Sequence, residues 1–221
     1  MKSSAFVRSV NIGSATLTEF SDMGTTGIDK RPVNGPIEVV APVSGSALAG
    51  DAICDLRHHG GPDQAVYAYA WEDLLGWAPE LGREVTPGLF GENLTTEGLE
   101  VNGALIGERW QLGPSLVLQV TVPRIPCRTF AGWLGERGWV KRFTQRALPG
   151  AYLRVLTPGA VRAGDPVRVL HRPGHGVTVA TVYRALTLEP ELLPLLLDVP
   201  ELPEATRDRV RQRTAAAREG A

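Results

Sequence analysis

The sequence predicts a mainly β fold: a closed or nearly closed barrel with a few helices, followed by a small unit of three helices. Two observations lead to this prediction. Short apolar runs alternate with Gly and Pro from residue 5 to about residue 170, and few helical patterns separate them. After the stretch HRPGHG at 171–176, the pattern becomes helical and rich in arginine. We therefore expect a barrel domain over 1–170 and a helical domain over 171–221.

Seven apolar runs are expected to form the strands, because they are short, rich in β-branched residues and bounded by turn residues. These runs are AFVRSVNI, IEVVAPV, AVYAYA, ALIGERWQL, LVLQVTV, YLRVL and PVRVL. Seven or more strands with few helices between them are typical of a closed or nearly closed barrel.

Two inserts and the tail are expected to be helical. The stretch WEDLLGWAPELG has apolar positions at helical spacing, and CRTFAGWLGERGWVKRFTQRA places aromatic residues among charged ones. In the tail, helical content is expected over 181–186 and 191–197 and in the stretch that begins with EATRDRV, where Glu204 near the start suits a helix dipole. The tail has no candidate ligand in its motifs, so we do not expect residues 177–221 to complete a site.

The composition is that of an ordinary globular chain. The 221 residues are 43% hydrophobic and 21% charged, and the net charge of −1 lacks the basic excess of a nucleic-acid binder. The N-terminus lacks the features of a signal peptide, and no apolar run is long enough to span a bilayer. We therefore expect a cytoplasmic protein with no membrane or nucleic-acid partner and with both cysteines reduced. Two cysteines are too few for a four-thiolate iron–sulfur cluster.

The stretch DLRHHGGPDQAVY at 55–67 combines an arginine, two histidines and two glycines. If this stretch is extended, His58 and His59 point to opposite faces and do not ligate one metal together. Glycine backbone beside Arg57 and the histidines can form a concavity that binds anions. A glycine turn that carries a solvated histidine pair explains the same residues, and the residue types alone favour this simpler interpretation.

Cys127 lies in the stretch VTVPRIPCRTF, at the expected end of a strand and start of a helix. Two prolines stiffen the approach, and a helix start flanked by Arg124 and Arg128 favours the thiolate, which is the nucleophilic and metal-binding form. The alternative is a small buried residue at a strand end. Cys54, in the apolar run DAICDL, is expected to be structural. The stretch GLFGENLTTEGL at 88–99 is a loop pattern with weak functional content on its own.

Six stretches together resemble the MOSC family, named for the C-terminal domain of molybdenum cofactor sulfurases, and within it the YiiM-like branch. They run in the order of the family and cover most of the chain: TGIDKRPV (26–33), DLRHHGGPDQAVY (55–67), FGENLTTEGL (90–99), IGERW (106–110), VTVPRIPC (120–127) and VRAGD (161–165). The resemblance implies a β-barrel of mixed strands with a C-terminal three-helix domain. It also implies binding of a molybdenum–pterin cofactor.

The resemblance further implies an activity and a set of site residues. Members of the branch reduce N-hydroxylated compounds, such as hydroxylaminopurine base analogues, to amines and so detoxify them. Cys127 would be the protein ligand of molybdenum, and His58 or His59 is the natural proton donor near neutral pH. The residues expected to contact the cofactor or the substrate are Lys30, Arg31, Arg57, His58, His59, Asn93, Arg109 and Arg124.

Electrons must return to such a centre after each turnover. The sequence contains neither an iron–sulfur pattern nor a dinucleotide-binding glycine fingerprint, so we expect a separate flavoprotein reductase as the donor. A homodimer is the default expectation for a soluble oligomer. Three alternatives stay open: a non-catalytic carrier of the cofactor or its sulfur, a metal-free thiol enzyme that uses Cys127 with His58 or His59, and a pyridoxal-phosphate enzyme that uses Lys30 or Lys141.

Overall fold

Strands dominate the architecture, as the sequence predicts. The computed structural model describes residues 4–219, and most of its strands belong to one sheet of eight in the order β12-β8-β9-β10-β6-β7-β1-β4. The strands of the described chain are β1 (Phe6–Gly13), β2 (Thr16–Leu17), β3 (Thr25–Thr26), β4 (Lys30–Pro32), β5 (Ile37–Val39), β6 (Val66–Ala70), β7 (Leu94–Glu97), β8 (Arg109–Leu112), β9 (Leu116–Pro123), β10 (Ala151–Thr157), β11 (Gly159–Val161) and β12 (Val167–His171).

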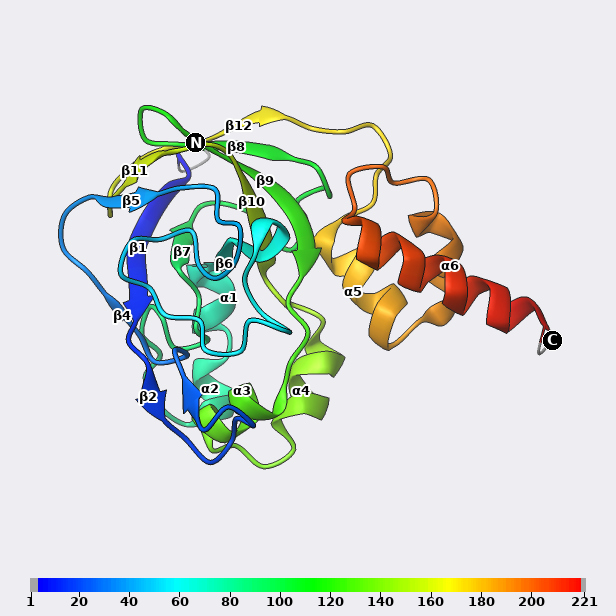
Figure 1. Cartoon of the computed structure of the whole chain (residues 1–221), viewed down its shortest axis with the longest axis horizontal. Coiled ribbons are helices and arrows are strands. Elements are labelled where there is room, and N and C mark those ends of the chain that lie inside the picture. The colour runs from blue at the N-terminus through cyan, green and yellow to red at the C-terminus, as the bar shows by residue number, and fades with distance from the viewer. Residues whose placement is uncertain (1–3, 220–221) are drawn as a thin grey trace.

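The large sheet is mixed and strongly curved (Figure 1). Its strands β6 and β7 run parallel, whereas its other neighbouring strands are antiparallel. An isolated bridge between Phe6 and Pro166 joins β1 to the chain that enters β12, and the backbone N–H of Val7 donates to the carbonyl oxygen of Asp165 at 2.8 Å. These contacts bring the two sides of the sheet together without a continuously paired cylinder in the described part of the chain. The closed barrel is therefore not confirmed.

Each of the seven expected apolar runs contains a strand, but two of these strands are shorter than their runs. In IEVVAPV only Ile37–Val39 is paired, because the partner strand β11 is itself three residues long. In ALIGERWQL the strand begins at Arg109, after Gly107 turns the chain with a φ of 87°. That conformation belongs to the left-handed region, which favours glycine and interrupts an extended chain.

The two helical inserts each form a pair of short helices. The first contains α1 (Trp71–Leu75) and α2 (Ala78–Leu81), and the second contains α3 (Arg128–Leu134) and α4 (Trp139–Arg146). Gly135 ends α3 in a left-handed conformation (φ 69°), so one long helix does not form.

Two hydrophobic clusters stabilise these layers. The larger one fills the inside of the curved sheet, and the second is a set of aromatic side chains gathered under α1 to α4. In the second cluster Trp77, Phe90, Phe130, Trp139 and Phe143 are all fully or almost fully buried, and the rings of Trp77 and Phe143 stack at 5.9 Å. Aromatic rings bury much apolar area with few rotatable bonds, so this cluster holds the start of α3, and with it the connection from β9, in a fixed position.

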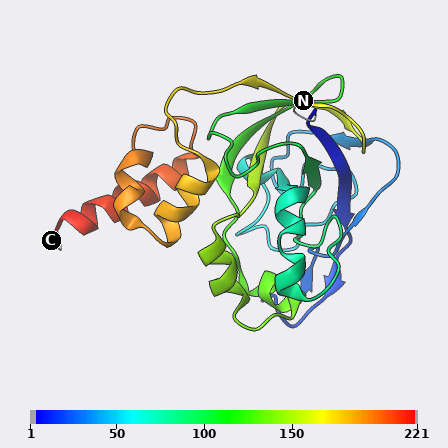
Figure 2. The same cartoon turned by 180° about the vertical axis from the view of Figure 1, so that it is seen from behind.

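The tail contains α5 (Val179–Thr187), a 3-10 helix η2 (Pro190–Leu196) and α6 (Glu204–Glu219). Both views place it to one side of the sheet, with α5 nearest the strands (Figures 1 and 2). Buried residues of the tail, such as Val182 and Val210, belong to the same hydrophobic cluster as the sheet. The domain boundary after residue 170 stays a prediction. Within residues 4–219, no helix combines the length and apolar character needed to cross a membrane.

Candidate functional site

Two adjoining cavities lie beside the connection between β9 and α3. The inner cavity has a volume of about 110 Å³ and the outer cavity about 430 Å³. Pockets for small organic ligands usually span roughly 300–1,000 Å³, so a ligand of that size needs more than the inner cavity alone. The residues that line both cavities are Ser21, Asp55, His59, Gln64, Cys127, Thr129 and Tyr152.

Cys127 lies where the sequence predicts, between the end of β9 at Pro123 and the start of α3. Burial of the thiol raises its pKa, but a hydrogen bond from His59, the charge of Arg124 and the backbone N–H of Phe130 outweigh burial. The pKa of the Cys127 thiol is therefore lowered from 9.0 to about 6. The thiolate is the main form at pH 7, which makes this sulfur a metal ligand or a nucleophile.

The two adjacent histidines have different surroundings. His59 lines both cavities beside Cys127 and is one of the groups that lower the pKa of that thiol. His58 is exposed and lines only the outer cavity, with its Nδ1 atom 2.9 Å from Oδ2 of Asp55. The segment is a turn and not an extended strand. The two histidines are therefore separated by the turn, and not by the alternation of side chains along a strand. A Cβ on Gly60 would lie 2.6 Å from a backbone oxygen of the neighbouring loop, so the turn requires glycine here.

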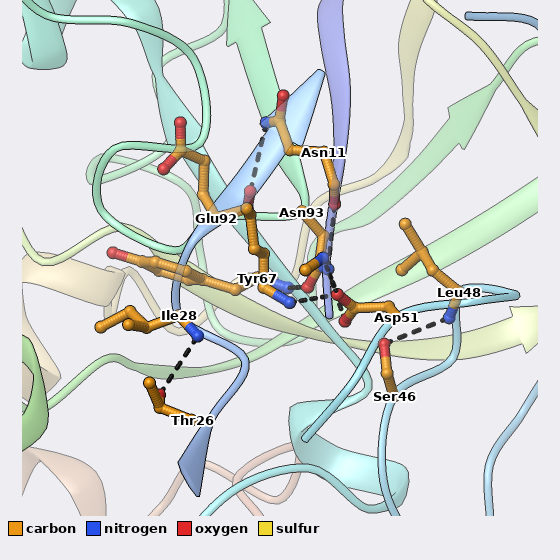
Figure 3. Close-up of polar contacts among 11 residues, drawn as sticks. Asn11, Thr26, Ile28, Ser46, Leu48, Asp51, Tyr67, Glu92 and Asn93 are labelled. Carbon is orange, nitrogen blue, oxygen red and sulfur yellow. Dashed lines mark hydrogen bonds and ion pairs between the residues drawn. The ribbon is translucent and has the colours of Figure 1, made fainter. Parts of the chain in front are cut away.

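A buried ionic network forms part of the inner cavity wall. Lys30 at the start of β4 forms an ion pair with Asp51, which also accepts hydrogen bonds from the backbone N–H of Gly13 (2.8 Å) and from Asn93 Nδ2 (2.9 Å). The Oδ1 atom of Asn93 accepts the backbone N–H of Tyr67 at 3.1 Å (Figure 3). Burial lowers the pKa of Lys30, while Asp51 acts in the opposite direction. The network therefore links β1, β4 and β6 through groups that satisfy one another.

Two other residues that line the inner cavity carry polar atoms without a partner. Arg124 is 5% exposed, and its guanidinium lies 3.8 Å over the ring of Phe130 and donates to the carbonyl oxygen of Phe90. The Nε atom of Arg124 and the Oε1 atom of Gln64 have no hydrogen-bond partner within residues 4–219. Buried polar atoms are normally paired, so these two offer a donor and an acceptor to a ligand.

Three residues expected at the site lie elsewhere. Arg31, Arg57 and Arg109 are exposed and line neither cavity. Arg31 forms an ion pair with Asp29 at 2.6 Å, and Arg57 contacts the sulfur of Met23. The structure does bring together Lys30, His59, Asn93, Arg124 and Cys127, with His58 at the outer cavity.

Several site residues were missed from the sequence. Cys54 was expected in a strand, but it lies in a bend and lines the inner cavity. Arg209 of α6 lines the outer cavity, whereas the sequence offered no candidate ligand in the tail, so whether the tail completes the site stays a prediction. Several arginines occur along α6, and no local pattern marks the one that meets the cavity. Gln64 lies in the stretch DLRHHGGPDQAVY but was not singled out, and Asp51 and Tyr152 lie in none of the six family stretches.

Comparisons with known proteins identify the family. The MOSC domain model matches residues 55–168. The chain is 35% identical over 179 residues to the uncharacterized protein YflK of Bacillus subtilis, covering 80% of this chain and 79% of YflK. It is 29% identical over 182 residues to a protein of Gibberella moniliformis named reductase, covering 81% of this chain but only 32% of that protein.

A solved structure gives the same result for the fold. The crystal structure of YiiM from Geobacillus stearothermophilus superposes with a TM-score of 0.76 and 26% sequence identity, covering 95% of this chain and 98% of that one. The matched family model includes the turn with the two histidines and the connection with Cys127. The chain therefore belongs to the MOSC domain family, and within that family it is similar to YiiM.

Proposed function

We propose that the protein is a molybdenum cofactor-dependent reductase that converts N-hydroxylated compounds, such as hydroxylaminopurine base analogues, to amines. The observation that carries the proposal is Cys127, a thiol that lines both cavities and whose pKa is lowered to about 6. Membership of the MOSC family supports an association with the molybdenum cofactor. The relative named reductase supports a role in reduction.

The donor atoms around the cavities fit such a cofactor. Within residues 4–219, no three His, Cys, Asp or Glu side chains are grouped to hold a metal ion. A metal beside Cys127 therefore fits best when an organic cofactor supplies most of its ligands. The unpartnered Nε of Arg124 would donate to the organic part or its anionic group, and Oε1 of Gln64 would accept a hydrogen bond from the organic part. Lys30 and Asn93 would complete the inner wall.

When bound, the cofactor supplies two-electron chemistry, so that R–NHOH, two electrons and two protons give R–NH₂ and water. The chain supplies orientation and protons. His59 holds a ring N–H beside Cys127 at the boundary of the two cavities, where it can donate a proton to a leaving group. Burial raises the pKa of Tyr152, so this phenol stays protonated and orients a substrate as a hydrogen-bond donor.

The electrons come from a separate flavoprotein reductase in this proposal. The chain has two cysteines, and Cys127 is assigned to the metal, so it does not supply the four thiolates of an iron–sulfur cluster. Metal content and turnover therefore have to be measured separately, with an artificial electron donor for turnover.

The test compares Cys127→Ser with Cys54→Ser, because both cysteines line the inner cavity. Both variants are made in a host that synthesises the cofactor, and molybdenum and pterin are measured per mole of protein. We expect Cys54→Ser to keep the metal and Cys127→Ser to lose at least about tenfold, since the protein ligand is removed. If Cys127→Ser keeps the metal while Cys54→Ser loses it, the assignment of the ligand is wrong.

The contact between His59 and Cys127 favours a second candidate, a thiol enzyme without metal. Full turnover by protein shown to be free of molybdenum would support that candidate and contradict the reductase. Bound cofactor without reduction of an N-hydroxylated base by an artificial donor would instead indicate a non-catalytic carrier.

A further inference from the structure

We propose that Arg209 of α6 binds a phosphate group of the molecule that occupies the outer cavity, so that the C-terminal helices complete the site. The proposal rests on the proposed function only where it names an N-hydroxylated substrate. Its basis is the charge pattern of the outer cavity and the way in which α6 is held against the rest of the protein.

The outer cavity is lined by three basic side chains besides His59, and two of them are neutralised locally. His58 pairs with Asp55 at 2.9 Å, and Arg128 pairs with Asp22 at 3.4 Å. Both carboxylates also line the cavity. Arg209 forms no ion pair or hydrogen bond with any residue in the described part of the chain. Among the described residues that line the outer cavity, Arg209 is therefore the arginine without a carboxylate partner.

The acidic residue nearest to Arg209 along α6 is already engaged. Asp208 accepts a hydrogen bond from Arg211 at 2.9 Å, one turn further along the helix. This pair keeps the carboxylate of Asp208 occupied and places Arg211 outside the residues that line the cavity. Arg211 is therefore a matched control for Arg209, because both are exposed arginines on the same helix.

The position of Arg209 is held by packing and not by its own contacts. The neighbouring residue Val210 is fully buried in the main hydrophobic cluster, and the hydroxyl of Thr214 donates to the carbonyl oxygen of Val210. Arg213 donates to the carbonyl oxygen of Leu186 at the end of α5, at 2.9 Å. The buried face of α6 thus fixes which side of the helix meets the cavity.

A free guanidinium at a cavity wall matches an anionic oxygen group, because its fork of N–H donors binds phosphate or carboxylate in two-pronged geometry. A phosphate monoester carries close to two negative charges at pH 7 and three acceptor oxygens, so it gains the most from this donor set. The cofactor and a nucleotide-like substrate could each bring such a group. In both cases the phosphate would lie near Arg209, and the reactive end of the molecule would point towards Cys127.

The test uses the full-length chain free of molybdenum and titrates it with adenosine 5′-monophosphate and with adenosine, which differ only by the phosphate. In low salt we expect the phosphorylated probe to bind at least about fivefold more tightly to the wild type, as one charge-assisted contact at an exposed side chain provides. Arg209→Gln should lose this preference, Arg209→Lys should keep part of it, and Arg211→Gln should keep all of it. Equal preference in Arg209→Gln and the wild type, or no preference in the wild type, would overturn the proposal.

Two further measurements distinguish the source of the phosphate in chains that pass this test. If Arg209→Gln made in a cofactor-competent host loses molybdenum, the phosphate belongs to the cofactor. If it keeps molybdenum but its KM rises for an N-hydroxylated nucleotide and not for the free base, the phosphate belongs to the substrate. Because the binding assay needs no turnover, an inactive wild type would contradict the proposed function and leave the role of Arg209 to be decided by binding alone.

Discussion

The inner wall and the outer cavity of the site use charged residues in different ways. On the inner wall, Lys30 is 8% exposed and the side chain of Asp51 is fully buried, and each satisfies the other. In the outer cavity, His58 and Arg209 are exposed, and Arg209 has no partner in the described chain. The same residue types therefore hold strands together in one region and remain available to a ligand in the other.

This difference suggests that the buried pair contributes to stability and that the exposed charges serve to bind a ligand. A buried charge that loses its partner keeps its desolvation penalty, so the inner pair is costly to break. An exposed pair is screened by water and contributes little to folding. Cys127 lies on the boundary, where burial and nearby positive groups act in opposite directions on its pKa. The reactive thiol thus lies between a wall of buried, paired charges and a cavity with exposed charges.

The largest effect should follow from breaking the inner pair. Asp51→Ala leaves Lys30 buried without its carboxylate and removes acceptors from Gly13 and Asn93. We expect the free energy of unfolding to fall by about 3 kcal/mol, measured by urea denaturation at pH 7.

The outer pair supplies the control for this measurement. Asp55→Ala removes the partner of the exposed His58 and the acceptor of the exposed backbone N–H of Arg57, and should cost less than about 1 kcal/mol. Adding Lys30→Met to Asp51→Ala should recover part of the lost stability, since no buried charge then remains. Equal losses in the two single variants would remove the distinction between the two regions.

An intermediate effect should appear at the boundary. His59→Gln removes an imidazole that lowers the pKa of the Cys127 thiol, so this pKa should rise above its value of about 6. In a Cys54→Ser background, the rate of alkylation by iodoacetamide at pH 6 should fall at least about fivefold, because less thiolate is present. The same rates should converge at high pH, where both thiols are ionised.

The sign of this pH dependence is a separate check. A thiol with a lowered pKa is reactive above that pKa and loses reactivity as the pH falls through about 6. His58→Gln is the matched control, because His58 pairs with Asp55 and is not among the groups that lower the pKa of Cys127, so the alkylation profile should stay unchanged. An unchanged profile in His59→Gln would show that Arg124 and the backbone alone lower the pKa.

The smallest effect should come from the arginines that lie outside both cavities. Arg31→Gln and Arg57→Gln should change the free energy of unfolding by less than about 0.5 kcal/mol, as exposed substitutions usually do. Molybdenum content should also stay at the wild-type level. Loss of the metal in Arg57→Gln would show that the turn reorganises around a bound cofactor and would bring this residue back into the site.

Local sequence was sufficient for the elements that carry the motifs. The apolar run before Pro123, followed by two prolines and then Cys127, predicted a strand end and a helix start, and both are found. The tendency to form a strand and the position of a glycine turn depend on residue types within a short window, so their signals are visible in the chain itself. The split of the second insert at Gly135 follows the same local rule, although its helical pattern alone suggested one helix.

By itself, the sequence determined the β-rich fold, the family resemblance and the placement of Cys127 before a helix. Only the tertiary structure decided which charges meet. Lys30 and Asp51 are paired because β4 and the loop after β5 fold against β1. Arg209 reaches the outer cavity because buried residues of α6, such as Val210, pack in the hydrophobic cluster that also includes α5 and the sheet. Such contacts join residues that are far apart in the chain. They form because burial of apolar surface brings those segments together, so a local pattern of residue types does not predict them.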